Sequence, residues 1–447
     1  MEGNRRGMTR RELLKAGTAA GLGLAASGGL WTPASAAEKN TLIFTGWSYE
    51  PDLVRQNLDR FEKLNPEYKI DYTPTETRSY REKLVAMFQA GTPLDALYVR
   101  DDYFSGWVEA GFLQPIDGLP GLAELDKDML DFTLDAMTHK GKRYGVPYYG
   151  DYMLFLYNKK ILADAGFGAP PKTLDELRSQ SETIKRNKLV EFPLLTAFGT
   201  TAGFYLDWWG FVYGSSGTLF DKAWAPTFPD KDKTALNVLE WMVAAIHDWK
   251  IMDVKVVEMV LEDVGTKEAF AQGQGAFVSQ FKYNTEWLNN PKFSKVAGQA
   301  KPCPYPSLSA GQKGTVGWTR QYCIPTHTKK KADAWKLLSY LGGKDEKGQY
   351  YTAKFWYLQR GLGFAYKPLW QDKEILDATN KWGDAKVFAE MAPAAKAREN
   401  IKAPWYSQWD SFNQARLQEA LLKKTKPRDA LAASAKKAED LMKEWKS

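Results

Sequence analysis

Short apolar runs alternate with amphipathic stretches along the chain after residue 40. In order, the segments are residues 41–45, 52–64, 68–72, 79–90 and 95–99. The first, third and fifth are short runs typical of strands, while the other two repeat apolar residues every three or four positions, as helices do. This alternation predicts a parallel α/β sheet. Ligands bind such sheets beyond the carboxyl ends of the strands, so we expect contacts in residues 46–50 and 100–103.

The remaining pattern predicts further helices and strands on both sides of a crossover between two lobes. Glycines and Pro147 within residues 145–151 favour a crossover there. The tryptophan-rich residues 205–217 either bury Trp208 and Trp209 or present them to a ligand. Helices are predicted at residues 173–185, 234–249, 266–272, 331–341 and 427–447, and a strand at 276–280, while residues 153–157 form an apolar stretch.

Residues 1–36 have the three parts of a removable export leader. A charged head with Arg10 and Arg11 side by side precedes an apolar run, and a small-x-small cleavage site ends the segment. The arginine pair predicts recognition by the twin-arginine translocase, with Met1 or Met8 as the start. A membrane anchor is disfavoured, because five glycines dilute a run shorter than the roughly 20 apolar residues of a span. We expect a periplasmic protein without a lipid anchor, since no cysteine follows the cleavage site directly.

The charge and the aromatic content narrow the function classes. The formal charge of +7 falls to +4 without residues 1–36, and no block of lysine and arginine indicates nucleic-acid binding. The lysines at 329–331 are expected to begin a solvated helix.

The chain is rich in aromatic residues: it has 17 tryptophans, 22 tyrosines and 22 phenylalanines, which together make up 14% of the chain. Aromatic rings pack in cores and also cover the apolar faces of sugars, so this abundance is compatible with a sugar site.

The sequence lacks the usual motifs for catalysis and metal binding. His139, His247 and His327 lie far apart, and no phosphate-binding loop, nucleophile turn or zinc-binding helix motif occurs. We therefore expect no catalytic residues, no metal and no cofactor. Asp101 and Asp102 leave two alternatives, a glycosidase-type carboxylate pair or a helix N-cap.

The two cysteines, Cys303 and Cys323, also leave two alternatives. If residues 301–306 and 315–325 are the arms of a hairpin, these cysteines lie opposite each other and can form a disulfide in an oxidising compartment. Because three prolines make the first arm irregular, two buried thiols are the other alternative.

Several motifs, in this order and spacing, give the chain a resemblance to a known family. They are residues 61–66 (FEKLNP), 91–96 (GTPLDA), 107–113 (WVEAGFL), 144–147 (YGVP), 156–159 (LYNK) and 332–338 (ADAWKLL). Over nearly the whole mature chain, the sequence resembles the periplasmic sugar-binding proteins of ATP-binding-cassette (ABC) importers. That group includes the maltose-binding and multiple-sugar-binding proteins.

The resemblance implies a two-lobed, type II-like periplasmic-binding-protein fold of the α/β class with hinge crossovers. It also implies that a monomer captures a mono- or oligosaccharide between its lobes and delivers it to the permease subunits of an ABC importer. The implied lobe segments are residues 38–148 and 300–345 for the N-lobe, and residues 149–299 and 346–447 for the C-lobe.

The resemblance also implies which residues contact the ligand. In chain order they are Trp47, Ser48, Tyr49, Glu50, Asp101, Asp102, Tyr103, Asp151, Trp208, Trp209, Phe281, Tyr283, Trp318, Arg320, Trp405, Tyr406 and Trp409. The paired glycines usual before the Trp318 strand are here Gly314 and Gly317. For the tryptophans the alternative is core packing, and for Asp151 it is a structural bond at the crossover.

Two other functions are compatible with the sequence. The first is a twin-arginine-exported enzyme that acts on glycosides. The second keeps the same fold but binds a polyamine, for which Asp101, Asp102 and Asp151 would supply the negative charge.

Overall fold

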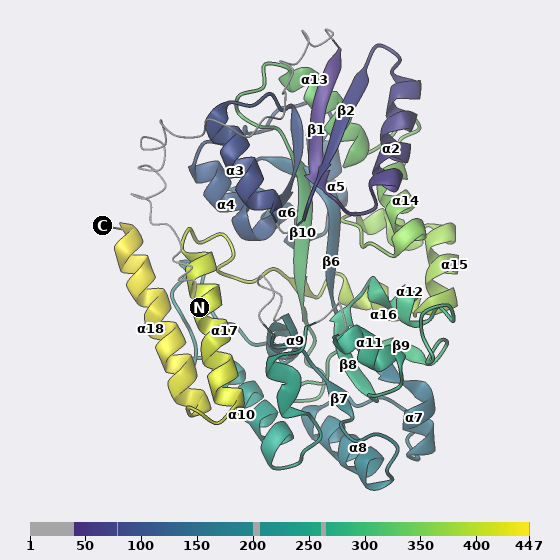
Figure 1. Ribbon diagram of the computed structural model, residues 1–447, viewed down its shortest axis with the longest axis vertical. Helices are drawn as coiled ribbons and strands as arrows, with labels where there is room; N and C mark the ends of the chain where they lie inside the picture. The colour runs from purple at the N-terminus through teal and green to yellow at the C-terminus, as the bar shows by residue number, and fades with distance from the viewer. Residues whose placement is uncertain (1–39, 78, 200–205, 261–264, 447) are drawn as a thin grey trace, which may run out of the picture. The chain divides into compact units, whose positions relative to one another are not determined.

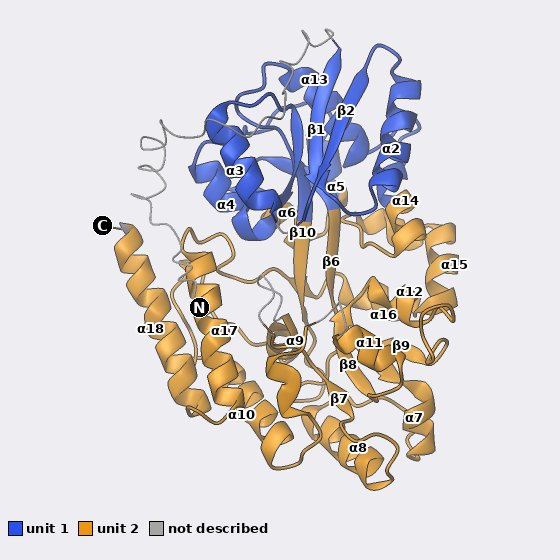
Figure 2. Ribbon diagram, viewed as in Figure 1, with its two compact units in different colours: residues 1–127, 137–148, 320–353 blue, residues 128–136, 149–319, 354–447 orange. Residues whose placement is uncertain are grey.

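The protein forms two compact units (Figure 2). The computed structural model describes residues 40–77, 79–199, 206–260 and 265–446. Unit 1 contains the described residues up to Lys127, together with Met137–Tyr148 and Arg320–Ala353; unit 2 contains Asp128–Ala136, Tyr149–Thr319 and the residues from Lys354 onward. The expected leader, residues 1–36, lies outside the described residues, and the lobe boundaries implied by the resemblance stay a prediction.

Unit 1 is built on a sheet whose first three strands are parallel. Strand β1 (Thr41–Trp47) lies between β2 (Lys69–Thr75) and β3 (Ala96–Arg100), and β10 (Thr315–Cys323) pairs antiparallel with β3. The helices are α2 (Pro51–Leu64), α3 (Tyr80–Ala90), α4 (Asp101–Glu109), α5 (Leu122–Asp128) and α13 (Lys331–Leu341) (Figure 1). Strand β4 (Thr138–His139) forms a small ribbon with β5 (Lys142–Arg143). The predicted parallel α/β sheet is confirmed.

The apolar pattern of unit 1 explains these elements. The first four residues of β3 are buried, as expected for a strand inside a sheet. Helix α2 buries Leu53, Val54, Leu58 and Phe61, which recur at helical spacing on one face. Gly91 follows α3 with a φ of 63°, the left-handed conformation that ends many helices.

Unit 2 is built around strand β6 (Gly145–Asn158), which enters from unit 1. Strand β8 (Phe277–Phe281) pairs antiparallel with β6 and parallel with β7 (Leu194–Leu195), while β9 (Ala300–Cys303) pairs with β6 and β11 (Ala395–Lys396) with β10. The α-helices of the remaining chain are α6 (Asp131–Ala136), α7 (Lys159–Asp164), α8 (Leu174–Arg186), α9 (Leu206–Gly214), α10 (Thr234–His247), α11 (Thr266–Ala271), α12 (Asn284–Leu288), α14 (Tyr351–Arg360), α15 (Lys373–Trp382), α16 (Ala385–Met391), α17 (Tyr406–Leu421) and α18 (Pro427–Lys446). The two 3-10 helices are η1 (Val254–Val257) and η2 (Lys367–Gln371).

The core of unit 2 is rich in aromatic residues. All nine residues of α9 are buried, including Trp208 and Trp209. Helices α17 and α18 lie side by side (Figure 1), and the indole Nε1 of Trp409 donates to the carbonyl of Ser434 across them at 3.0 Å. Burial of so many rings stabilises this unit, because each contributes about 1.5–3 kcal/mol or more on leaving water.

The structure decides between alternatives that the sequence left open. The hairpin on which a disulfide would depend does not form, because β9 pairs with β6 while β10 pairs with β3 and β11. Cys303 and Cys323 are both buried and both free thiols, which agrees with the second alternative for them. Neither Asp101 nor Asp102 caps α4; the N-cap residue is Arg100, and both aspartates lie in the first turn, where the positive end of the helix dipole favours them.

Candidate ligand-binding site

The ends of β1 and β3 bring the predicted contact residues of unit 1 to one edge of its sheet. The two strands are parallel, with Phe44 opposite Ala96, so their carboxyl ends point the same way. Trp47 ends β1 and is followed by Ser48, whose N–H donates to the Thr75 carbonyl at 2.7 Å. The residues after these two strands therefore form one polar edge, where α/β sheets bind ligands.

The loop after β1 is held in place by helix α2. Glu50 has a φ of 48°, and its carbonyl accepts from the N–H groups of Leu53 and Val54 at 2.9 and 3.1 Å. A left-handed conformation is uncommon for a residue with a side chain, so these bonds help to fix the loop. Ser48 is exposed and Tyr49 is half-buried, which leaves their side chains available to solvent.

Two arginine–aspartate pairs lie at the end of β3. Arg320 on β10 stands opposite Arg100 on β3, and its Nη1 lies 2.6 Å from Oδ1 of Asp101. Arg100 binds Asp102 through two hydrogen bonds of 2.9 Å, from Nε and Nη2. Two arginines thus balance two carboxylates. The pairs differ in exposure: Asp101 is 1% exposed, whereas the Asp102 side chain retains 22% of its surface.

Aromatic rings adjoin these charged pairs in unit 1. Trp47 is buried, with its ring centroid 4.7 Å from that of Tyr98. Tyr103 packs on Trp107 of the same helix at 4.5 Å, and its hydroxyl has no hydrogen-bond partner within the described part of the chain. Burial raises the pKa of Tyr103, so the hydroxyl keeps its proton and can donate a hydrogen bond.

Asp151 in unit 2 lies in the protein interior and not on an open surface. One carboxylate oxygen accepts from the N–H of Tyr152 at 2.9 Å and lies 3.6 Å from Nζ of Lys282, and the other accepts from the N–H of Gly363 at 2.8 Å. Lys282 also donates to the carbonyl of Gly361 at 2.8 Å. Both charged side chains are 0% exposed. These contacts favour the structural-bond alternative for Asp151.

Burial sets the protonation behaviour of this pair. It raises the pKa of Asp151 to about 6, although Lys282 and the two backbone N–H groups oppose the shift. Burial also lowers the pKa of Lys282, with Asp151 opposing. The ring of Tyr357, 5.0 Å from the ammonium, adds a cation–π contact. The pair neutralises itself and holds the residue 361–363 segment against β6.

The aromatic residues predicted for unit 2 fall into two groups. Phe281 stacks on Tyr283 with ring centroids 5.1 Å apart, and Trp318 meets Phe281 edge-on at 5.2 Å. Tyr283 is only half-buried, so this group retains an accessible ring. Near the start of α17, Trp405 and Tyr406 are buried, and the Tyr406 hydroxyl donates to Asp410 at 2.9 Å.

Trp208, Trp209 and Trp409 belong to a continuous apolar core. Each is 0% exposed, and the Trp209 ring lies 5.5 Å from Trp208 and 6.1 Å from Trp409. Rings enclosed on all sides by other core residues are already used for packing. This arrangement favours the core-packing alternative for these three positions.

Sequence reasoning missed several polar residues near the predicted ones. They are Arg100, Lys282, Glu399 and Asn400. Lys282 lies between two aromatic residues at the end of β8, and a lysine in such an apolar segment is a usable signal. Glu399 and Asn400 lie in the polar run that precedes Trp405. Burial raises the pKa of Glu399 to about 7, although the Tyr213 hydroxyl donates to it at 2.7 Å.

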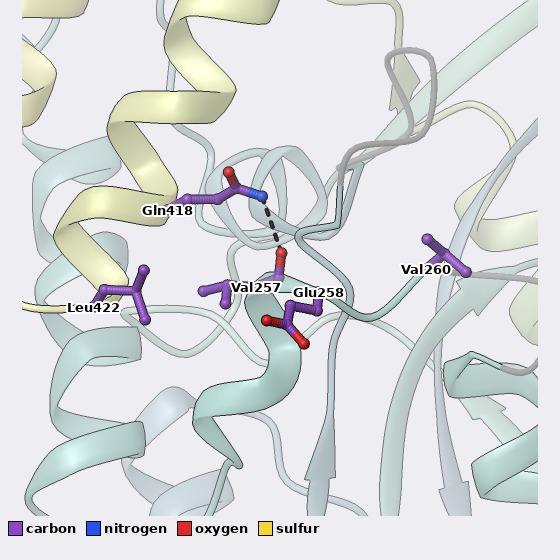
Figure 3. Close-up of a pocket in the computed structure, with 5 residues that line it drawn as sticks. All are labelled: Val257, Glu258, Val260, Gln418 and Leu422. Carbon is purple, nitrogen blue, oxygen red and sulfur yellow. Dashed lines mark hydrogen bonds between the residues drawn. The ribbon is translucent and has the colours of Figure 1, made fainter. Parts of the chain in front are cut away.

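A separate pocket of about 390 Å³ occurs in unit 2 and contains none of the predicted contacts. It is lined by Val257, Glu258, Val260, Gln418 and Leu422 (Figure 3). The Gln418 amide donates to the Val257 carbonyl at 2.9 Å.

The described ranges contain no cluster of three or more residues suited to hold a metal ion. Within the same ranges, every helix is too short or too polar to cross a bilayer.

Comparison with known proteins identifies the family. The family model for bacterial extracellular solute-binding proteins matches residues 47–348, more than half of the chain. The chain belongs to this family. A binding protein of Brucella abortus (strain 2308) is 24% identical to this solute-binding protein over 436 residues, which cover 96% of this chain and 98% of that protein.

Two further similarities concern proteins with named ligands. The diacetylchitobiose-binding protein DasA of Streptomyces coelicolor (strain ATCC BAA-471 / A3(2) / M145) is 25% identical over 257 residues, 56% of each protein. The structure of maltose-bound MalE3 of T. maritima has a TM-score of 0.73 and 20% identity, and the match covers 90% of this chain and 99% of that one. The two-lobed fold expected for this solute-binding protein is thereby confirmed.

Proposed function

We propose that the mature protein captures a neutral carbohydrate and delivers it to the permease subunits of an ABC importer. The observation that carries this proposal is the pairing of charges at the predicted contact residues. Asp101 is paired with Arg320, Asp102 with Arg100, and Asp151 with Lys282. A site whose charges cancel offers hydrogen bonds without selecting a charged ligand, and it suits the hydroxyl groups of a sugar.

In this proposal, each unit contributes its own contacts. Unit 1 supplies the polar loop Trp47, Ser48, Tyr49 and Glu50, the charged pairs and Tyr103. Unit 2 supplies Phe281, Tyr283 and Trp318, with Trp405 and Tyr406 at the start of α17. The half-buried Tyr283 stacked on Phe281 is suited to the apolar face of a sugar ring. The similarity to the diacetylchitobiose-binding protein DasA and to maltose-bound MalE3 supports a carbohydrate as the ligand.

The charge pairing disfavours both alternatives raised by the sequence. A polyamine needs carboxylates that retain unbalanced negative charge, and each of the three aspartates already faces a lysine or arginine of this chain. A glycosidase needs one carboxyl group free to give a proton to the leaving oxygen. Asp101 and Asp102 both accept hydrogen bonds from arginine, so neither carboxyl group is free for this role.

Recovery of the bound ligand separates a binding protein from an enzyme. The mature protein is incubated with an oligosaccharide mixture, separated from free sugar, denatured, and the released ligand is identified by mass spectrometry. We expect an oligosaccharide of the mixture, unchanged in mass. Release of shortened sugars, with time-dependent loss of the parent, would contradict the proposal and favour a glycoside-acting enzyme.

We further propose that the precursor is exported to the periplasm by the twin-arginine translocase and that the mature protein is a monomer without a lipid anchor. Changing both Arg10 and Arg11 to lysine should leave the precursor in the cytoplasm, because the translocase reads that pair. The matched control changes Arg5 and Arg6, an arginine pair outside the motif, and should be exported normally. Periplasmic recovery of the first variant at the control level would refute twin-arginine export.

A further inference from the structure

The first turn of helix α3 lies at the same sheet edge as the predicted contact residues of unit 1. Strand β2 runs parallel to β1, with Thr75 opposite Trp47 at their ends, so the chain leaves β2 at the edge where it leaves β1 and β3. Helix α3 begins shortly afterwards, at Tyr80. Three parallel strands therefore end at this edge, whereas the predicted contacts, residues 47–50 and 101–103, follow only two of them.

Tyr80 holds this first turn of α3 against the ends of β1 and β3. Its side chain is buried, and its ring meets the Trp47 ring edge-on with centroids 5.6 Å apart. The Tyr80 hydroxyl donates to the Tyr98 carbonyl on β3 at 2.9 Å. The backbone of the next residue, Arg81, is therefore fixed by core contacts, and it loses little further freedom when a ligand binds.

The Arg81 side chain lies beside the end of β3 and has no counter-ion. Its guanidinium carbon is 5.8 Å from the ring centroid of Tyr103, one of the predicted contacts. Arg81 is exposed, and its side chain forms no hydrogen bond or salt bridge with the residues that the structure describes. The other two arginines of this edge, Arg100 and Arg320, donate to aspartates. Arg81 thus carries five N–H donors for which the described chain supplies no acceptor.

The stability of the fold does not account for a cation at this position. The first turn of a helix carries the positive end of the helix dipole, which disfavours arginine there and favours an acidic residue such as the neighbouring Glu82. The contact with Tyr103 also contributes little, because 5.8 Å is near the limit of about 6 Å for a cation–π interaction. A role outside the fold, in ligand binding, explains Arg81 better than either contact.

We propose that Arg81 is a further ligand contact, whose guanidinium donates hydrogen bonds to hydroxyl oxygens of the carbohydrate. Sugar hydroxyl groups both donate and accept, and the aspartates of this edge only accept, so Arg81 supplies the donors that complete their recognition. The planar guanidinium can donate to two neighbouring oxygens at once. The inference rests on the proposed carbohydrate function and adds the end of β2 to the ligand site. An unpaired cation at this edge also disfavours a polyamine.

The test compares Arg81→Gln with Lys83→Gln by calorimetry, using the sugar recovered with the wild-type protein. Each change removes one positive charge from an exposed residue of α3, and Lys83 lies about 200° round the helix from Arg81. Arg81→Gln should weaken binding about ten-fold or more, because charge-assisted hydrogen bonds to the sugar are lost. Lys83→Gln should bind within about two-fold of wild type, and both variants should keep the wild-type melting temperature.

Deoxy analogues of the same sugar separate a direct contact from an effect that Arg81 transmits through Tyr103. Removing one hydroxyl group at a time should identify a position whose loss weakens binding to the wild type but not to Arg81→Gln, the signature of a direct contact in a double-mutant cycle. Wild-type affinity of Arg81→Gln, or the same fractional loss for the parent sugar and for every deoxy analogue, would overturn the inference and leave the proposed function intact. Failure of the wild type to bind any sugar would overturn the proposed function itself.

Discussion

The two units place the same kinds of charged residues in opposite surroundings. At the β3 edge of unit 1, Arg100 and Asp102 keep about a fifth of their side-chain surface exposed while forming a two-bond pair. In unit 2, Asp151 and Lys282 have no exposed surface and meet at 3.6 Å. Paired side chains that keep some exposed surface, as Arg100 and Asp102 do, can replace a bound water molecule with a ligand hydroxyl group. The Asp151–Lys282 pair has no contact with solvent, and its hydrogen bonds to the backbone support the fold.

The pKa values of exposed and of enclosed carboxyl groups shift in opposite directions. In unit 1, the hydrogen bond and charge of Lys336 lower the pKa of exposed Glu67. In unit 2, burial raises the pKa of Asp151 to about 6 and those of Asp207 and Glu399 to about 7. These three carboxyl groups of unit 2 are enclosed in the protein interior, where burial disfavours their charge, whereas the more exposed Asp372 and Asp440 of the same unit have lowered pKa values. The predictions below test whether this difference separates stability from binding.

The largest expected effect is on stability, from removing the buried cation of unit 2. Lys282→Met leaves Asp151 buried without its counter-charge, and breaking a buried pair in this way costs about 3–5 kcal/mol. The free energy of unfolding should be measured by denaturant titration. The control is Lys160→Met, which breaks an exposed pair with Asp164 and should cost less than about 1 kcal/mol. Equal losses in the two variants would show that the burial of the Asp151–Lys282 pair has no consequence for stability.

The next effect is a pH dependence of the unfolding free energy, which arises from Asp207 in the core of unit 2. Asp207 is 0% exposed, and its carboxylate accepts from the Ala197 N–H at 2.6 Å and from the Ser279 hydroxyl at 2.7 Å. Burial raises its folded-state pKa to about 7 from 3.8. The folded state therefore holds the proton more tightly than the unfolded chain. The stability that protonation contributes is complete below about pH 4 and is lost as the pH rises through 7, by about 3–4 kcal/mol.

Asp207→Asn should remove this dependence, because asparagine does not titrate and its NH2 can donate to Ser279. The measurement is the difference in unfolding free energy between wild type and variant at each pH from 4 to 8, so that titration of other groups cancels. The unfolding free energy of the variant should increase relative to that of the wild type as the pH rises. A constant difference across the range would mean that Asp207 does not titrate in the folded protein between these pH values.

A smaller effect is expected on binding, from the partly exposed pair of unit 1. Asp102→Ala removes the hydrogen bonds that Asp102 can make to a sugar and frees Arg100 from its fixed geometry. Charge-assisted hydrogen bonds contribute roughly 1.5–3 kcal/mol, so affinity should fall about ten-fold or more. The unfolding free energy should change by less than about 1 kcal/mol, as for other pairs open to solvent.

Asp59→Ala is the matched control for this prediction. Asp59 forms a more exposed pair with Arg55 on α2, away from the strand ends. The Asp59→Ala variant should therefore bind the sugar with wild-type affinity. If Asp102→Ala binds as tightly as this control, the pair at the end of β3 is not part of the ligand site.

The repeating elements of both units could be predicted from the sequence. The strand–helix alternation of unit 1 predicted β1, α2, β2, α3 and β3 within a few residues, because short apolar runs mark the strands and apolar residues recur every three or four positions in the helices. In unit 2, helical periodicity predicted α8, α10 and α18 equally well. Local patterns of this kind depend only on neighbouring residues, which a single sequence contains.

Pairings between distant residues could not be predicted. Nothing near Cys303 indicates that its strand pairs with β6 instead of β10, because strand partners depend on the whole sheet. For Asp151, the sequence left a ligand contact and a structural bond as alternatives, because it does not show that Lys282, more than a hundred residues later, lies beside it.

Calorimetric titration of the mature wild-type protein with neutral sugars and with spermidine tests the central claim most directly. Because the aspartates at the predicted contacts are balanced by Arg100, Arg320 and Lys282, at least one neutral sugar should bind saturably at one site. Spermidine should give no saturable heat. Saturable binding of spermidine, with none of any sugar, would show that negative charge and not hydroxyl recognition defines the site, and would contradict the account.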